Sequence, residues 1–424
     1  MKKLLIIFSY KYPFSPPVEQ FLHMEMPYHN SEDTDIWFVP YARDCLNEKY
    51  DISEIKHTAI KQIKRKNRFV ELFDGVVGMI GSIGNTYSEL VRIHHKRDIE
   101  KKVCLSSFLR TTIQSQSLYR EIKTTINIDD LKGYSAIVLY SYWLNPMATA
   151  ICFYKQFLEK HGFSNVRAIA RAHGQGDLYL EPDTGKYRPN AALLSKELNR
   201  IYSISQNGMN HLKEQELTNV EVSRLGVKVI AFPDGVKNRD RKMIVSCSVI
   251  NSNKRVIDIA KAISQLNMPV SWVHFGSGPE ENALLQWCKD NMPKNIEWKL
   301  NGWTLNKEVL SFYLENRPDT FVNLSYVEGI PVSIMEAMSC GIPCVATDTG
   351  ASSEIVENEV NGFLVSRNLV MNEVTEAIRK CLGASSEELK RAALKTATQK
   401  YCAETNFRQF SNEIWKLKAG EEGR

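Results

Sequence analysis

The chain has 424 residues, of which 43% are hydrophobic and 24% are charged. This length and composition exclude a disordered chain and a small disulfide-stabilised domain, and they predict two or three packed domains. The net charge of +5 comes from 54 basic and 49 acidic residues, which is modest for this size and is weak support for nucleic-acid binding.

The first ten residues, MKKLLIIFSY, resemble a signal peptide only superficially. Their apolar run extends from Leu4 to Phe8, and the Lys11-Tyr12-Pro13 that follows is not a cleavage site. We therefore predict a buried parallel strand here. No run approaches 18 apolar residues, so a membrane-spanning helix is not expected. Nine cysteines scattered through apolar segments indicate reduced thiols in the cytoplasm.

Apolar runs typical of buried strands alternate with helical segments through much of the chain. This alternation predicts an α/β fold with parallel sheets covered by helices. It restarts near residue 242, after the polar segment 233–242, which we interpret as a linker between two doubly wound domains. Ligands bind beyond the carboxyl ends of such strands, so a cleft between the domains is the expected site. The runs are LLIIFSY, DIWFVP, SAIVLYS, VRAIAR, RIYSIS, KMIVSCSV, SWVHFG, DTFVNLS and IPCVATD.

Positive charge is concentrated in residues 56–123. This stretch holds fourteen Lys or Arg and six Asp or Glu, a net +8, so the rest of the chain sums to −3. Its segment KQIKRKNRFVELFDGVVGMIGSIG places basic residues directly before an apolar run, which suits an amphipathic element on an anionic membrane. The alternative is a solvated helical face with a packed apolar side, and four glycines argue against one long helix.

Two glutamates separated by seven residues follow the strand-like FVNLS. Glu328 precedes Gly-Ile-Pro, and Pro331 is well placed at a helix start, where exposed amides attract phosphate. Glu336 lies farther along that helix, where its two oxygens can accept from both hydroxyls of a ribose. The alternative is that Glu328 is a helix-entry acid and Glu336 a surface residue, but apolar neighbours around Glu336 favour a specific partner.

The segment EGIPVSIME and the following GIPCVATDTGASSEIVENEVNGFLV resemble the donor site of retaining glycosyltransferases of family 4, particularly those that build bacterial capsule, exopolysaccharide and O-antigen. Weaker similarity extends over YPFSPPVEQFLHMEMPY, RAHGQGDLYLE, SCSVINSNKR, HFGSGP and NGW. The resemblance implies the GT-B fold, in which two Rossmann-like doubly wound domains face each other across a cleft. It divides the chain into an acceptor-side domain (1–235) with the basic insertion, a donor domain (236–400), and a terminal helix (401–424) that packs back toward the first domain.

The resemblance also implies roles on the donor side. Glu336 would bind the ribose, Glu328 the sugar hydroxyls, and Lys254 would neutralise the leaving diphosphate, with the amides of Gly329, Ile330, Pro331 and Val332 along the donor. An arginine usual in the family is replaced by Val249, and Arg255 is a candidate to replace it. Trp303 is expected either to stack near the nucleotide base or to belong to the core.

On the acceptor side, His173 matches a family histidine near the reaction centre, although alone it would be interpreted as a loop histidine bound to backbone. Asp177 continues that pattern, together with Tyr179 and Glu181. Pro16-Pro17 replaces the usual glycine pair, and proline removes amide donors. Pro16 and Glu19 are therefore assigned to an acceptor pocket, with a solvated helix face carrying Glu19 and Glu25 as the alternative.

The expected activity is transfer of a sugar from a UDP- or GDP-sugar to a hydroxyl of a glycan or lipid-linked glycan, with anomeric retention. No metal or other cofactor is expected, and Asp33-Thr34-Asp35, which spells a metal-binding D-x-D, precedes a strand far from the donor motif. Expected partners are the donor, the acceptor and an anionic membrane contacted through 56–123, without nucleic acid. The expected location is the cytoplasm, at the inner face of the membrane. Alternatives are a nucleotide-sugar epimerase and a silent sugar-nucleotide-binding subunit.

Overall fold

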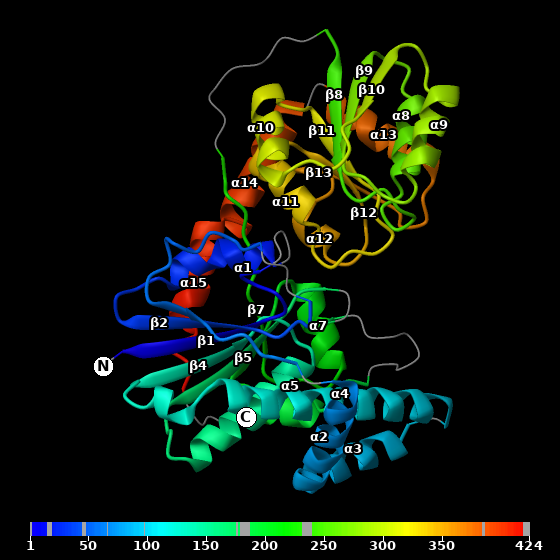
Figure 1. Cartoon of the computed structure of the whole chain (residues 1–424). Helices are drawn as coiled ribbons and strands as arrows, with labels where there is room; N and C mark the ends of the chain where they lie inside the picture. Colours follow the sequence, from blue (N-terminus) through cyan, green and yellow to red (C-terminus); the bar gives the residue numbers. More distant parts are fainter. Residues whose placement is uncertain are drawn as a thin grey trace. The chain divides into compact units, whose positions relative to one another are not determined.

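The computed structural model describes residues 2–14, 19–44, 48–65, 67–96, 98–174, 177–178, 187–230, 240–383 and 386–418. The chain divides into two compact units (Figure 1). The first unit comprises Met1–Ser223 and Phe407–Arg424, and the second comprises Arg224–Asn406. Most of the predicted linker 233–242, including the predicted boundary at 235, lies outside the described residues.

The first unit is built on a seven-stranded parallel sheet in the order β3-β2-β1-β4-β5-β6-β7. Its central strands are continuous apolar runs because both faces of the sheet are covered. Leu5 of β1 lies between Ile36 of β2 and Val138 of β4. The strands are β1 (Lys3–Ser9), β2 (Thr34–Pro40), β3 (Thr58–Ile60), β4 (Ala136–Ser141), β5 (Val166–Ala172), β6 (Arg200–Ser203) and β7 (Val220–Val222).

Helices cover both faces of this sheet because successive strand residues point to opposite sides. Leu4 and Ile6 belong to a core with α4 and α5, whereas Leu5 and Ile7 belong to a core with α1 and α15 (Ala403–Glu413). Helix α5 begins at Pro146, and the Asn145 side chain caps it by accepting from the Met147 amide at 2.9 Å. The helices are α1 (Gln20–Glu25), η1 (Met26–His29), α2 (Arg68–Gly81), α3 (Ile83–His94), α4 (Asp98–Thr125), η2 (Ile128–Leu131), α5 (Pro146–Lys160), α6 (Ala191–Glu197) and α7 (Gln206–Glu214).

The second unit is built on a six-stranded parallel sheet in the order β10-β9-β8-β11-β12-β13. Its strands are β8 (Lys242–Cys247), β9 (Val270–Phe275), β10 (Ile296–Leu300), β11 (Thr320–Asn323), β12 (Cys344–Thr347) and β13 (Gly362–Val365). Its helices are α8 (Val256–Ser264), α9 (Glu281–Asn291), α10 (Asn306–Asn316), α11 (Val332–Ser339), α12 (Ser352–Ile355), α13 (Met371–Leu382) and α14 (Ser386–Lys400). Helix α15 (Ala403–Glu413) begins in this unit and ends in the first.

Both sheets reverse their winding direction at one position. In the first unit the reversal falls between β1 and β4, and in the second it falls between β8 and β11. Loops leave such a pair of strands in opposite directions, which opens a crevice at their carboxyl ends. The predicted fold class, two Rossmann-like doubly wound units, is confirmed, and the strand order predicts where each unit binds its ligand.

None of the described helices is both long and apolar enough to cross a membrane.

Candidate functional site

The loops that follow β8 and β11 are joined to each other at the reversal point of the second sheet. The Tyr326 amide donates to the Asn253 carbonyl at 2.7 Å, and the Val327 amide donates to Asn253 Oδ1 at 3.0 Å. These bonds bring the next residue of each loop together, so that Lys254 Nζ forms an ion pair with Glu328 Oε1. A cation and a carboxylate that lie 74 positions apart in sequence therefore meet at the expected ligand position.

Gly350, in the loop after β12, lies directly against the Glu328 backbone. Its φ is +56°, and a Cβ built on it would lie 1.8 Å from the Glu328 carbonyl oxygen. The next amide, that of Ala351, donates to the Gly329 carbonyl at 3.0 Å. Glycine is required here because both the backbone conformation and the close approach exclude a side chain.

We expect Gly350→Ala to displace the Glu328 loop, to destabilise the second unit by about 1–3 kcal/mol, and to weaken donor binding. Gly133→Ala is the matched control, because Gly133 has φ +94° but no atom within 4 Å of an added Cβ. Urea denaturation and calorimetric titration of a nucleotide diphosphate measure the two effects. Equal loss of stability in both variants, with intact nucleotide binding, would show that the close approach is unimportant.

Helix α11 begins immediately after this loop. It starts at Val332, one residue later than predicted, and Pro331 caps it in an extended conformation. Ile330 and Pro331 are buried, whereas Gly329 and Val332 are half-buried. Because proline has no N–H, the amides of Gly329, Ile330 and Val332 are the backbone donors that this segment can offer to an anion.

Glu336 has a specific partner in the structure. Its Oε1 accepts from Asn306 Nδ2 at 2.7 Å, and Asn306 is the first residue of α10. Burial raises the pKa of Glu336 to about 7, so the carboxyl group exchanges its proton near neutral pH. The interpretation of Glu336 as a solvated surface residue is therefore wrong. Asn306 escaped the sequence analysis because no local pattern links α10 to α11.

The raised pKa of Glu336 predicts opposite effects of pH on donor affinity and on stability. Protonation removes acceptor capacity from the Glu336 carboxylate, so the donor affinity expected from the predicted ribose contact should fall as the pH drops below about 7. The folded protein binds this proton more tightly than the unfolded chain, so stability should decrease as the pH rises from about 4.5 to about 7. Glu336→Gln should therefore unfold at a higher temperature than wild type at about pH 8, and it should bind donor poorly. Melting and titration at both ends of this range check the prediction; a variant less stable than wild type at high pH would contradict it.

Val249, Trp303 and Arg255 lie on loops of the second unit for which the sequence left alternatives open. Val249 is 52% exposed, and Trp303 is 68% exposed, so the interpretation of Trp303 as a core residue is wrong. Arg255 donates to the Arg367 carbonyl at 2.8 Å, and its guanidinium lies 4.6 Å from the Tyr326 ring centroid. Arg255 thus joins the loops after β8, β11 and β13, next to Lys254. Whether it replaces the missing arginine stays a prediction, as does stacking of Trp303 on a base.

In the first unit, Glu19 fixes the loop that follows β1. Its carboxylate accepts from the amides of Tyr10, Lys11 and Tyr12 at 2.7–2.8 Å, and from Trp143 Nε1 at 2.6 Å. Glu19 is buried, and so is Glu25, so the interpretation of these residues as a solvated face is wrong. Pro16, like Pro17, lies outside the described residues.

His173, in the loop after β5, lies against the same tryptophan. Its ring centroid is 4.8 Å from that of Trp143 and 4.3 Å from that of Tyr142. His173 Nε2 lies 3.0 Å from the Tyr142 carbonyl, and burial together with Arg171 lowers the pKa of His173 to about 3. The ring is therefore neutral with its proton on Nε2, which leaves Nδ1 as an acceptor for a hydroxyl.

Asp177 lies within this cluster and is buried. Its Oδ2 accepts from the His173 amide at 3.3 Å, and burial raises the pKa of Asp177 to about 7. Arg188 donates to the Asp177 carbonyl, which ties the short described segment to the rest of the unit. Tyr179 and Glu181, which continue the predicted pattern, lie outside the described residues.

Trp143 joins His173 to Glu19 and was missed in the sequence analysis. It follows β4, at the reversal point between β1 and β4, so its position satisfies the rule for ligand binding in doubly wound sheets. The aromatic residues of SYWLNP, directly after the strand-like SAIVLYS, are the signal that could have indicated it.

A pocket of about 300 Å³ opens beside this cluster. It is lined by residues from the segments after β1, β2, β3 and β4 and from helices α4 and α5, namely Tyr10, Tyr41, Ala42, Arg43, Asp44, Arg65, Gln114, Leu118, Asn145, Pro146 and Met147. The Asn145 side chain donates to the Tyr41 hydroxyl at 2.7 Å, which fixes two of these walls. Through Tyr10, the pocket adjoins Glu19. Through Asn145, it adjoins Trp143.

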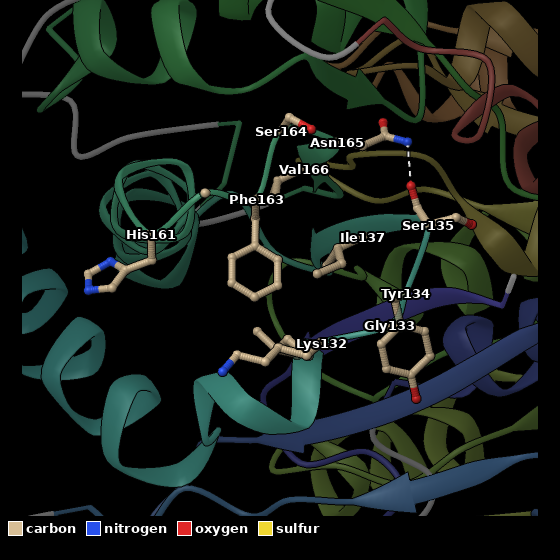
Figure 2. A pocket seen from close by; sticks show the side chains of 12 residues that line it. Lys132, Gly133, Tyr134, Ser135, Ile137, His161, Phe163, Ser164, Asn165 and Val166 are labelled. Carbon is tan, nitrogen blue, oxygen red and sulfur yellow. Dashed lines mark hydrogen bonds between the residues drawn. The ribbon is translucent and has the colours of Figure 1, made fainter.

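A second pocket, of about 330 Å³, lies at the opposite edge of the same sheet (Figure 2). Gly133–Ser135 and Phe163–Asn165, which line it, precede the amino ends of β4 and β5, and Asn165 Nδ2 donates to the Ser135 carbonyl at 2.7 Å. Because His173 follows the carboxyl end of β5, this pocket is remote from the cluster and is not part of the candidate site.

The Asp33-Thr34-Asp35 sequence lies at the amino end of β2, also away from the carboxyl edge. Asp35 pairs with Lys2 at 2.7 Å and accepts from the Tyr134 hydroxyl at 2.6 Å, while Asp33 pairs with Lys3 at 3.3 Å. These contacts give both carboxylates structural partners. Among the described residues, no three His, Cys, Asp or Glu side chains gather as a metal site would require.

Comparison with known proteins finds sequence similarity over the second unit. Residues 229–401 match the family of group 1 glycosyltransferases. The match covers the segments that hold Lys254, Glu328 and Glu336. The chain is 26% identical over 129 residues to N-acetyl-alpha-D-glucosaminyl L-malate synthase of Bacillus anthracis, covering 30% of this chain and 32% of that protein. It is 28% identical over 160 residues to the putative colanic acid biosynthesis glycosyltransferase WcaL of Escherichia coli, covering 35% and 39%. The chain thus matches only about a third of the length of these relatives.

Solved structures resemble the whole chain in fold. The lipopolysaccharide outer core galactosyltransferase WaaB aligns with a TM-score of 0.63 at 14% identity, covering 98% of this chain and 99% of that protein. Anabaena HepE in complex with UDP aligns with a TM-score of 0.64 at 14% identity, covering 98% and 100%. At these identities the likeness establishes the two-unit GT-B fold alone.

Proposed function

We propose that this protein is a retaining glycosyltransferase that moves a sugar from a UDP- or GDP-sugar to a hydroxyl of a glycan or lipid-linked glycan in cell-surface polysaccharide biosynthesis. The observation that carries the proposal is the Lys254–Glu328 pair at the reversal point between β8 and β11. A cation, backbone amides and a carboxylate at this edge are the groups that a diphosphate and a sugar require. The family match over 229–401 and the UDP bound to HepE support this choice of donor.

Each donor-side residue then has a defined role. Lys254 leaves Glu328 to neutralise the diphosphate, and Glu328 becomes available to accept from sugar hydroxyls. The bond from the anomeric carbon to the phosphate oxygen breaks, and the acceptor oxygen forms its bond on the same face. The acceptor proton passes to the leaving phosphate. A fixed cation beside the developing charge lowers the barrier, and with Lys254 and the helix start in this role we propose that no metal is used.

The acceptor side is assigned to the first unit. Trp143 and His173 offer two tilted aromatic rings and an Nδ1 acceptor for sugar hydroxyls, and the pocket beside Tyr10 and Asn145 offers room for the acceptor glycan. Glu19 shapes this loop through its amide bonds rather than through free oxygens. We propose peripheral membrane association through 56–123, with the acceptor at the cytoplasmic face.

A panel of nucleotide sugars, incubated with and without lipid-linked acceptors, tests the proposal. Release of nucleotide diphosphate that depends on acceptor is the expected result. Isomerised donor without release would instead indicate an epimerase. Donor binding with neither outcome would indicate a silent binding subunit, which the exposed Val249 at the usual arginine position favours as the second candidate.

A further inference from the structure

Helices α2 and α3 turn most of their apolar residues toward solvent. Phe69 at the start of α2 is 85% exposed, and Ile80 and Ile83, on either side of the turn between the helices, are 69% and 72% exposed. Soluble proteins rarely leave so many neighbouring apolar side chains in water. We call this the α2–α3 face, and it consists of Phe69, Val70, Leu72, Phe73, Val76, Val77, Ile80, Ile83, Tyr87, Leu90 and Val91. The predicted alternative, in which the apolar side is packed, is wrong.

The acidic residues of the same two helices point inward. Asp74 accepts from Arg120 Nη1 at 2.6 Å, and Glu89 accepts from the Tyr187 hydroxyl at 2.8 Å; both carboxylates are buried. Glu71 forms an ion pair with Arg43 at 2.5 Å. These three are the acidic residues of 68–94, so the α2–α3 face presents no negative charge.

Close packing holds the two helices in this orientation. A Cβ on Gly75 would lie 2.6 Å from the Ile113 Cα of α4, and one on Gly78 would lie 2.5 Å from Gln116 Oε1. Gly75 and Gly78, two of the four glycines that argued against one long helix, therefore allow α2 to approach α4 closely. Figure 1 shows α2 and α3 packed along α4, on the side away from the sheet. The exposed apolar face is thus a fixed feature of the unit.

We propose that the α2–α3 face inserts into the interfacial region of an anionic lipid bilayer, in the leaflet that faces the protein. The argument for lipid is charge complementarity: Lys64 and Arg68 are exposed at the start of α2, and Lys102 is exposed on α4. The 14 residues of α2 span about 21 Å, too short to cross a bilayer, so the helices lie in its interface. This inference rests on the membrane contact in the proposed function and deepens it, because insertion of apolar side chains, rather than the basic run alone, provides the binding.

Flotation with vesicles of phosphatidylcholine and phosphatidylglycerol tests this surface. We expect wild type to float and the triple variant Phe73→Ser/Ile80→Ser/Ile83→Ser to bind at least about tenfold more weakly. Its melting temperature should be unchanged because all three side chains are exposed. The matched control is Val360→Ser/Val370→Ser, which removes apolar residues that are 47% and 57% exposed on the second unit and should bind as wild type does.

A charge variant separates insertion of apolar side chains from electrostatic attraction to anionic lipid. Lys64→Gln/Arg68→Gln should weaken binding about fivefold for each cation removed, whereas high salt should leave a substantial part of the wild-type binding intact. Binding that high salt abolishes completely, while the triple serine variant floats normally, would overturn the proposal. Absence of wild-type flotation would overturn it as well.

A second copy of the chain is the competing occupant of the face. Light scattering after size exclusion identifies it: a wild-type dimer that the triple variant converts to monomers, with unchanged flotation, would overturn the lipid assignment. Nucleotide diphosphate titration of the same samples keeps the two proposals distinguishable. If wild type binds nucleotide but does not float, lipid insertion by the α2–α3 face is rejected and the proposed sugar transfer is not. If wild type floats but does not bind nucleotide, the proposed sugar transfer is rejected and lipid insertion is not.

Discussion

Lys254→Ala should lower donor turnover by about 100- to 1,000-fold, the typical cost of removing one preorganised group that stabilises transition-state charge. The backbone of Lys254 is held by the Asn251 turn, where its amide donates to Asn251 Oδ1 at 3.0 Å, so the side chain extends from a fixed point in the loop. The loss should fall mainly on kcat, because the negative charge on the leaving diphosphate increases in the transition state. Steady-state release of nucleotide diphosphate measures it.

Lys261→Ala is the control for removing a lysine from this region. Lys261 lies on α8 and pairs with Asp258 at 2.9 Å near the surface, so turnover should be unchanged. Arg255→Ala in the same assay tests whether Arg255 replaces the arginine missing at Val249. An Arg255→Ala rate equal to wild type would show that Arg255 does not replace the missing arginine. A Lys254→Ala rate within about threefold of wild type would reject the role of Lys254 itself.

The largest expected loss of stability follows from Arg171→Met. Arg171 on β5 is fully buried and pairs with Glu25, whose other oxygen lies 3.0 Å from His29 Nε2. Its guanidinium also lies 4.0 Å from the ring centroid of Phe410 in α15. Removing Arg171 leaves the Glu25 carboxylate without its cation in the core, which should cost about 3–5 kcal/mol.

Urea denaturation of Arg171→Met and of Glu25→Gln/Arg171→Met checks this interpretation. The double variant should recover much of the lost stability, because the neutral amide can still accept from His29 without a buried charge. A single variant that loses less than about 1 kcal/mol would indicate that water or another cation compensates Glu25. Equal losses in both variants would indicate that packing of Arg171 on Phe410, rather than charge, is the main contribution.

The buried central strands were predictable from sequence, because a doubly covered parallel strand must be continuously apolar. LLIIFSY became β1 and KMIVSCSV became β8, each within two residues of the predicted limits. The short strands β3 and β7, at the edges of the first sheet, and β10 at the edge of the second were not predicted. TAI and VEV are three-residue strands, and IEWKL alternates apolar and polar residues, so tertiary pairing rather than local pattern determines them.

The donor motif was predictable because Glu328 and Glu336 lie in one continuous segment. The partners supplied by other loops were not: Asn306 for Glu336, Trp143 for Glu19 and His173. The same limitation explains the inverted polarity of α2 and α3. Residues 68–94 predict an amphipathic element, but the sequence alone does not show that its acidic side is buried and its apolar side exposed.

Transfer itself is the central claim, and one measurement tests it most directly. The protein is incubated with the nucleotide sugar it binds and a lipid-linked acceptor, and the anomeric proton of the transferred sugar is followed by NMR. We expect the sugar on the acceptor with the anomeric configuration of the donor, and no product with Lys254→Ala. Product with inverted configuration, isomerised donor, or donor that remains intact with every acceptor would contradict the account.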